Sequence, residues 1–307
     1  MSDLLPFGPG AWVFIGLYVA SLLLLGWKGR AARKEDTLQD FYLAERDFGY
    51  IVLLLTLYAT QYSGNTFFGV AGATYRLGFA WLIAVHYMLS VIVFYLAFAP
   101  KLHRLSHDRG YVTPVDYLED RFDSRAISLI ASVVMIAALS NYLLAQLMTM
   151  GRALQGLAGP YGDQAYNYGV VGLALIMVIY GTLGGLRAIA WTDVIQGSVL
   201  MVGFLILLVL LANQFGPLSA ATERVVASTD AFKVARPAPA MLREWFSYII
   251  VIGMGGALYP HAIQRIYAAK SSRTMRRSLA TMAFLPFTTA LVAVIAGIYA
   301  LAYVPGL

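Results

Sequence analysis

A cluster of polar residues interrupts a long apolar stretch early in the chain. Residues 60–66 read Thr-Gln-Tyr-Ser-Gly-Asn-Thr, so six of seven carry a polar side-chain group and the seventh is glycine. Inside a bilayer such groups need partners, and a helix broken there exposes backbone carbonyl and amide groups. Those groups can hold a small ion and a solute, so we predict a binding site here. Close helix packing is the alternative, and we favour it for Gly69, Gly72 and Ala73.

A second apolar stretch has the same character. Between residues 248 and 261 it contains Gly253, Gly255 and Gly256, followed by Pro260. Glycine and then proline would break a helix in mid-membrane. Two interrupted helices in corresponding halves of a chain indicate an inverted-repeat transporter with its site between them. The alternative is a proline kink without function, which membrane helices tolerate.

The composition excludes several classes of protein. Of the 307 residues, 60% are hydrophobic and only 12% are charged, against roughly a quarter charged in soluble domains. The absence of cysteine excludes disulfides and cysteine-ligated metals. The formal net charge is +6, but the cations lie in loops between apolar segments, which argues against a nucleic-acid partner. No phosphate-binding loop, nucleophile elbow or zinc-protease motif occurs, so we expect a protein that is not an enzyme.

Eight apolar segments are near the roughly 20 residues needed to cross a bilayer. They are residues 11–27, 50–75, 79–99, 126–157, 168–183, 192–212, 245–266 and 280–304. If the N-terminus is outside, the cytoplasmic loops contain 16 of the 22 Lys and Arg residues and the external side contains 6. The bias predicts a multi-pass protein of the bacterial inner (plasma) membrane, surrounded by lipid, with its N-terminus outside.

Three further motifs suggest a family. Residues 40–46 read DFYLAER and residues 113–122 read TPVDYLEDRF. The most specific motif is residues 180–197, YGTLGGLRAIAWTDVIQG, and Pro260, His261, Gln264 and Arg265 also fit. With these motifs in this order along the whole chain, the sequence resembles the sodium:solute symporter family.

The resemblance implies an all-α membrane protein with a LeuT-type inverted-repeat architecture, in one transmembrane transporter domain spanning residues 1–307. Residues 1–47 would be a leading helix and cytoplasmic loop, and residues 48–212 the first five-helix repeat. Residues 213–244 would be an external loop, and residues 245–307 the start of the second repeat. We expect the domain to be incomplete at its C-terminus, lacking later helices of the family.

The resemblance also implies a partial sodium site at the first helix break. The carbonyls of Ala59 and Tyr62 and the hydroxyl of Ser63 would be ligands, and neutral oxygens suit a monovalent cation. In the family, the remaining oxygens come from a Ser/Thr pair on a helix that would follow Leu307. The counterpart of Asp193 is linked to sodium passage toward the cytoplasm; the alternative for Asp193 is a helix N-cap. Sodium would be a co-transported ligand, no cofactor is implied, and a proton stays open as the coupling ion.

The expected solute-binding residues lie around the two breaks and on neighbouring helices. They are Gln61, Asn65, Thr66, His86, Tyr142, Gln146, Gly255, Gly256 and Tyr259. Among them, His86 and Gln146 have an alternative role in hydrogen bonding between helices.

Some nearby residues have simpler structural roles, and others indicate which solute is not expected. We interpret Arg265 as a snorkelling anchor, and the pair His103 and His107 as part of a solvated cytoplasmic loop. Proline transporters of the family have an acid at the position of Gln61 and an aromatic pair at those of Ile252 and Gly256. Proline is therefore not the expected solute.

These observations favour a symporter, driven by sodium, that imports a small polar organic solute such as a carboxylate-bearing metabolite or an amino acid. One alternative is the transporter-like sensory domain of a membrane histidine kinase. Another is a remnant that only anchors. The oligomeric state stays undetermined.

Overall fold

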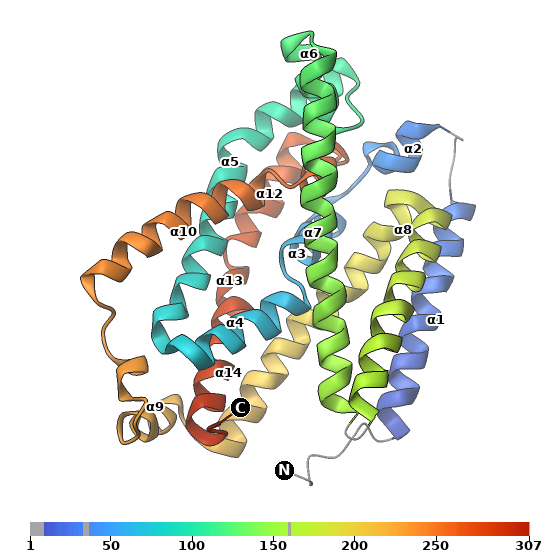
Figure 1. Ribbon diagram of the computed structural model, residues 1–307. Coiled ribbons are helices and arrows are strands. Elements are labelled where there is room, and N and C mark those ends of the chain that lie inside the picture. The colour runs from blue at the N-terminus through green and yellow to red at the C-terminus, as the bar shows by residue number, and fades with distance from the viewer. Residues whose placement is uncertain (1–8, 33–36, 159–160, 307) are drawn as a thin grey trace.

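Helices dominate the computed structural model, which describes residues 9–32, 37–158 and 161–306. Within these ranges the single extended pairing is an isolated parallel bridge between Phe48 and Ala269. Figure 1 shows the helices as one bundle. In chain order the α-helices are α1 (Pro9–Ala31), α2 (Leu38–Leu43), α3 (Tyr50–Gln61), α4 (Gly64–Leu77), α5 (Ile83–Arg109), α6 (Pro114–Phe122), α7 (Arg125–Leu157), α8 (Gly162–Phe215), α9 (Leu218–Val226), α10 (Pro239–Ala257), α11 (Pro260–Tyr267), α12 (Ser272–Met282), α13 (Leu285–Thr288) and α14 (Ala290–Tyr303). Short 3₁₀ turns η1 (Ala44–Arg46), η2 (Gly78–Leu82) and η4 (Ala231–Val234) lie between them.

The first predicted helix break lies between α3 and α4. Tyr62 and Ser63 have extended backbone angles, with ψ of 123° and −179°. The local sequence stabilises this break, because Ser63 and Thr66 form a reciprocal capping box at the start of α4. The Ser63 oxygen accepts from the Thr66 amide, and the Thr66 Oγ1 accepts from the Ser63 amide at 3.2 Å. Only two residues therefore separate the end of α3 from the start of α4.

The second predicted break lies between α10 and α11, which meet at an angle of 53°. Tyr259 has an extended ψ of 128° and precedes Pro260, the first residue of α11. Proline clashes with a helical residue before it and starts a helix well, which explains both the break and the restart. Both interruptions predicted from the sequence are confirmed.

Helix α8 folds back on itself at one glycine. Gly185 has φ 59° and ψ −157°, and Figure 1 shows α8 as two arms, lime and yellow, that diverge. Helical structure resumes directly after Gly185, so Thr192 and Asp193 lie well inside the second arm. The alternative that Asp193 is a helix N-cap is therefore wrong.

All eight predicted apolar segments fall on helices, although their bounds differ from those expected. Within the described residues, five helical stretches are long and apolar enough to cross a membrane, and the bent pair α10–α11 makes six if it is counted as one span. The count is lower than eight because the stretches 64–109 and 162–215 each cover two predicted segments. The segment at 280–304 is not one helix, since it begins in α12 and bends at Thr289 before α14.

The packing buries α3 and α11 inside the bundle, whereas α10 lies on its outside against α5. Helices α1 and α7 pack on α8, α3 packs on α8, α10 packs on α5, and α14 packs on α4. The largest cluster of buried apolar side chains joins α3, α5, α11 and α12. In Figure 1, α2 and α6 lie at one end of the bundle and α9 at the other. The predicted cytoplasmic and external loops are thus on opposite ends.

We expect Gly185→Ala to destabilise the protein by about 1–3 kcal/mol, because its backbone angles belong to a region that only glycine adopts readily. A Cβ there would also lie 2.5 Å from the Phe41 carbonyl oxygen. The thermal unfolding midpoint of the detergent-solubilised protein measures the effect. Gly181→Ala is the control, since a Cβ at Gly181 meets no atom within 4 Å. Equal midpoints for the two variants would contradict the strain argument.

Candidate functional site

A polar cavity of about 390 Å³ lies where the two helix breaks face α5 and α7. Eight of the nine predicted solute-binding residues line it, together with Ser63 from the predicted ion site. These residues are Gln61, Ser63, Asn65, Thr66, Tyr142, Gln146, Gly255, Gly256 and Tyr259. The other lining residues were not predicted to bind the solute, and they are Thr60, Tyr87, Met88, Val91, Val251 and Ile252. The chain thus brings polar groups from four separate elements to one hollow.

His86 is the exception, and its placement is a correction. Its side chain is exposed, and its Nδ1 lies 3.2 Å from the Leu82 carbonyl of its own helix. Its ring lies beside Trp245, 5.9 Å between centroids. The neighbouring residue Tyr87 lines the cavity instead. An ionisable residue in an apolar segment was the signal for His86, but that signal does not say which face of the helix the residue occupies.

The end of α3 offers free backbone oxygens next to the cavity. The last carbonyls of a helix have no partner within it. Here the Tyr58 carbonyl accepts from the Tyr62 amide, and the Thr60 carbonyl accepts from the Tyr142 hydroxyl at 3.3 Å. Among the described residues, no amide or hydroxyl donor reaches the carbonyl of Ala59 or Tyr62. These are the two carbonyls that the family resemblance selected as ion ligands.

The Gln61 amide connects the two broken helices. Its Nε2 donates to the Tyr95 hydroxyl at 2.6 Å and to the Gly256 carbonyl at 3.2 Å. The Tyr95 hydroxyl also donates to the Gly256 carbonyl, at 3.2 Å. One side chain from the first break and one from α5 therefore satisfy a carbonyl near the end of α10. Tyr95 is fully buried and was missed from the sequence, although a hydroxyl inside an apolar segment is a signal of the same kind as residues 60–66.

Three rings form one side of the site. Tyr142, Tyr259 and His261 lie with centroids 5.3–5.4 Å apart in each pairing. Tyr142 and Tyr259 line the cavity, while His261 lies behind them with its buried Nε2 lacking a hydrogen-bond partner among the described residues. The rings join α7 to the second helix break, so a movement of α11 would reach the cavity wall.

Beneath the cavity, a buried ion pair joins α8 to α11. The Arg265 Nη2 donates to Asp193 Oδ2 at 2.7 Å, and Arg265 Nε donates to the Thr56 Oγ1 at 2.7 Å. The Thr56 hydroxyl in turn donates to Asp193 Oδ2. Arg265 is 6% exposed and Asp193 is 8% exposed. The interpretation of Arg265 as a snorkelling anchor is therefore wrong, because its guanidinium points inward and each of its three nitrogens donates a hydrogen bond, to Thr56, Asp193 and the His261 carbonyl.

The same contacts limit the predicted role of Asp193 as an ion ligand. Its Oδ2 is shared by Arg265 and Thr56, and the residue does not line the cavity. Access of an ion to this carboxylate would require the pair to open. The Tyr62 side chain is buried and packs on Tyr58, with ring centroids 4.8 Å apart, so Tyr62 offers only its backbone carbonyl at the break.

A second set of contacts ties the same helices together at the end of the bundle near α2. The Phe48 amide donates to the Ala268 carbonyl at 3.0 Å, and the Lys270 amide donates to the Phe48 carbonyl at 3.1 Å. Arg46 donates to the Ser106 and Tyr111 carbonyls at 2.7 and 2.8 Å. Burial lowers the pKa of the Arg46 guanidinium, and these carbonyls offset that loss of water. The segment before α3 is thus hydrogen-bonded to the segment that follows α11.

His103 belongs to this contact region, which corrects the sequence interpretation of a solvated loop, whereas His107 lies next to it on the same helix and is exposed. Both lie in α5, and His103 is 4% exposed. The His103 Nε2 bonds the Ala269 carbonyl at 2.9 Å, and its Nδ1 bonds the Ser272 hydroxyl at 3.2 Å. The described residues contain no group of three or more His, Cys, Asp or Glu side chains that could hold a metal ion.

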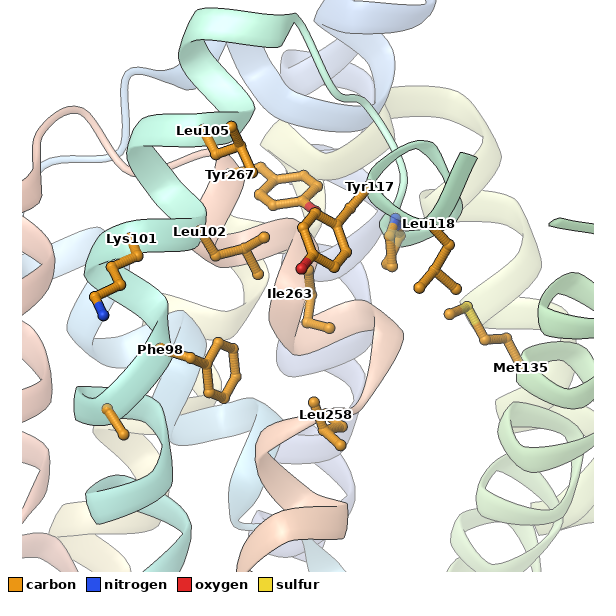
Figure 2. Close-up of a pocket in the computed structure, with 12 residues that line it drawn as sticks. Phe98, Lys101, Leu102, Leu105, Tyr117, Leu118, Met135, Leu258, Ile263 and Tyr267 are labelled. Carbon is orange, nitrogen blue, oxygen red and sulfur yellow. The ribbon is translucent and has the colours of Figure 1, made fainter. Parts of the chain in front are cut away.

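A larger cavity, of about 690 Å³, lies between α5, α6, α7 and α11 (Figure 2). Its lining is mostly apolar and includes Phe98, Leu102 and Ile263. Figure 2 shows Lys101 extending from α5 away from the ring of Tyr117. Because its polar groups do not converge, this hollow is a poor host for a small polar solute. The smaller cavity at the helix breaks is therefore the candidate site.

The long apolar helices, two of them interrupted beside a polar cavity, define the class of this molecule as a multi-pass membrane protein. The family model described as the sodium:solute symporter family matches residues 41–306. The chain belongs to the sodium:solute symporter family, as its motifs predicted.

Known relatives agree with this assignment. The chain is 27% identical over 273 residues to a sodium/pantothenate symporter of Escherichia coli, covering 87% of this chain and 56% of that protein. It is 26% identical over 280 residues to a monocarboxylate transport permease of Rhizobium johnstonii, covering 88% of this chain and 55% of that protein. The chain thus spans about half the length of the relatives it matches.

A solved structure supports the fold. An outward-open, substrate-bound structure of a Na⁺-coupled sialic acid symporter superposes with a TM-score of 0.78 at 20% identity. The match covers 95% of this chain and 60% of that one. The predicted all-helical, LeuT-type fold is confirmed.

We expect Arg265→Gln to cost about 3–5 kcal/mol of unfolding free energy, because it leaves the Asp193 carboxylate buried without its cation. The double variant Arg265→Gln/Asp193→Asn should lose much less than the two single variants summed. Unfolding of the detergent-solubilised protein measures all three. Lys270→Gln is the control, since the Lys270–Asp47 pair is 63% and 61% exposed and should contribute less than about 1 kcal/mol. Additive single effects would contradict the buried coupling.

Proposed function

We propose that this chain forms the ion and solute site of a sodium-coupled symporter that imports a small polar organic solute. The observation that carries the proposal is the coincidence of two helix breaks, free backbone oxygens and a neutral polar cavity. Family membership supports sodium as the coupling ion. The relatives act, by their names, on pantothenate and monocarboxylates, so a carboxylate-bearing metabolite or an amino acid is the solute class we propose.

In this proposal, sodium lies at the first break against the carbonyls of Ala59 and Tyr62 and the hydroxyl of Ser63. The Ser63 oxygen already accepts from the Thr66 amide, but a hydroxyl oxygen has a second lone pair for a cation. Neutral oxygen ligands suit a monovalent ion, and Asp193 would receive the ion on its way to the cytoplasm. The solute would contact Gln61, Asn65, Thr66, Tyr142 and Gln146 in the cavity beside it.

Transport would follow from a shift between two conformations. Sodium would order the first break and favour the outward-open form, and the solute would then close it. For release to the cytoplasm, the Thr56–Arg265–Asp193 contacts and the pairing of Phe48 with Ala269 would have to separate. Both sets join the same two interrupted helices at the end away from α9, so they would act as the closed inner side of the pathway.

The membrane orientation belongs to the same proposal. The chain has the apolar helices of a multi-pass membrane protein, and its predicted cytoplasmic loops lie at one end of the bundle. We place the end with α2 and α6 in the cytoplasm of a bacterial cell and the N-terminus outside, because Lys and Arg favour the cytoplasmic side.

We expect Ser63→Ala to raise by about twofold to tenfold the sodium concentration needed for a given increase in the thermal unfolding midpoint, since one neutral ligand contributes roughly 0.5–1.5 kcal/mol. Thermal unfolding at increasing NaCl, with choline chloride replacing it at constant ionic strength, measures this concentration. Ser271→Ala is the matched control, because Ser271 caps α12 through the Thr274 amide and lies outside the cavity. It should lower the unfolding midpoint at every NaCl concentration without changing the sodium concentration needed for a given increase. The same sodium requirement in Ser63→Ala as in the wild-type protein would contradict the ion-site assignment.

A further inference from the structure

The larger cavity, between α5, α6, α7 and α11, has an interior that resembles hydrocarbon. Its volume is about 690 Å³, which is ample for a ligand of considerable size. Figure 2 shows Phe98 and Leu102 of α5 facing Leu118 of α6 and Met135 of α7, with Ile263 of α11 between them. A polar molecule would lose its hydration in this space without finding partners, whereas an apolar chain would not. The interior therefore favours a ligand with a hydrocarbon part.

Two tyrosine hydroxyls without partners lie at one end of this cavity. Tyr267 is fully buried, and its hydroxyl has no hydrogen-bond partner among the described residues. The Tyr117 ring packs edge-on against Tyr111, and its hydroxyl also makes no hydrogen bond with the described residues. Figure 2 shows both rings together, near Leu105. A buried hydroxyl without an acceptor is costly, so these two groups indicate a ligand that carries acceptor oxygens.

The edge of the cavity carries one unpaired cation. Lys101 lines the cavity, is exposed, and forms no ion pair or hydrogen bond with the described residues. It lies two residues beyond the predicted apolar segment 79–99, where α5 leaves the hydrocarbon layer. A long cationic side chain at this depth extends toward the lipid phosphates. An anionic group on the ligand would therefore find its counter-charge here.

We propose that this cavity binds one anionic phospholipid. An acyl chain would occupy the apolar interior, the ester oxygens would accept from the hydroxyls of Tyr117 and Tyr267, and the phosphate would face Lys101. A further protein helix matches these groups less well. Its backbone carbonyls are satisfied within the helix, so the hydroxyls would gain no partner, and an apolar helix would cover Lys101 without a counter-charge.

The proposed lipid would stabilise the arrangement of helices described above. Ile263 and Tyr267 belong to α11, which also carries Arg265 of the buried ion pair with Asp193. A phospholipid between α5 and α11 would hold α11 in this position. The inference goes beyond the proposed function, because it concerns the stability of one conformation and does not depend on which ion or solute is carried.

Thermal unfolding of the delipidated protein in detergent tests the proposal with three additives. These are dioleoyl-phosphatidylglycerol, which is anionic, dioleoyl-phosphatidylcholine, which has the same chains but no net charge, and inorganic phosphate. Phosphatidylglycerol should raise the unfolding midpoint by about 2–4 °C more than phosphatidylcholine does, because a ligand of the folded state stabilises it. Inorganic phosphate should have no effect, since it cannot fill the apolar interior. Native mass spectrometry should detect one phosphatidylglycerol retained per chain.

Two variants and a control assign the effect to this cavity. Lys101→Gln should raise by about fivefold the phosphatidylglycerol concentration needed for a given increase in midpoint. Arg273→Gln is the charge-matched control, because Arg273 is exposed at the start of α12 and lies outside the cavity.

Tyr267→Phe gives a second, independent readout. It removes a buried hydroxyl that has no partner, so the midpoint of the lipid-free protein should stay the same or rise. The same variant should need about twofold to tenfold more phosphatidylglycerol for a given increase in midpoint, because the lipid loses a hydrogen bond. A merely structural role for Tyr267 would instead lower the midpoint with and without lipid.

Three results would overturn the inference. Equal stabilisation by phosphatidylglycerol and phosphatidylcholine would show that the headgroup charge is not recognised. Equal losses in Lys101→Gln and Arg273→Gln would show a diffuse attraction of the basic surface for lipid. The absence of any lipid effect on the wild-type protein, with no lipid retained, would mean that another part of the protein covers the cavity.

Discussion

The structure depends on how the polar groups of two broken helices are satisfied inside an apolar bundle. A helix end leaves carbonyls or amides without partners, and lipid supplies none. Here the Gln61 amide and the Tyr95 hydroxyl meet at the Gly256 carbonyl, so each break stabilises the other. The capping box of Ser63 and Thr66 satisfies the amides at the start of α4. The carbonyls of Ala59 and Tyr62 have no hydrogen-bond donor among the described residues, and these free oxygens make the region suitable for a cation.

The buried pair of Arg265 and Asp193 adds a second connection with a different energetic character. Taking two charges out of water costs as much as their attraction returns, so such a pair is weak evidence for stability. Its value lies in specificity, since Thr56 on α3 completes the hydrogen bonding only when α3, α8 and α11 are in this arrangement. Separation of these helices would expose both charges to water entering from the end of the bundle near α2, where their hydration offsets the lost contact. Such a connection can hold a closed form without making it irreversible.

The sequence contained enough to predict the two breaks and most of the cavity, and the reason is the cost of polar groups in lipid. Gln61, Asn65 and Gln146 stand out in apolar segments because hydrogen-bonding side chains there require partners. Pairs of residues far apart in the chain give no such signal. Arg265 and Asp193 are on different helices, and each, considered alone, was interpreted as a residue at a helix end. Nor does an apolar segment reveal which face turns inward, which is why His86 was placed in the site and Tyr95 was missed.

The neutrality of the cavity bears on how ion and solute would be coupled. Moving one charge into a low-dielectric hollow without a counter-charge is unfavourable for sodium and for a carboxylate alike. If the two bind at neighbouring positions, each lowers the electrostatic cost of the other, and the coupling free energy acts equally in both directions. An acidic side chain at position 61 would supply that counter-charge permanently, and sodium binding would then depend less on bound solute. Gln61 therefore suits a carrier in which the cargo itself completes the charge balance.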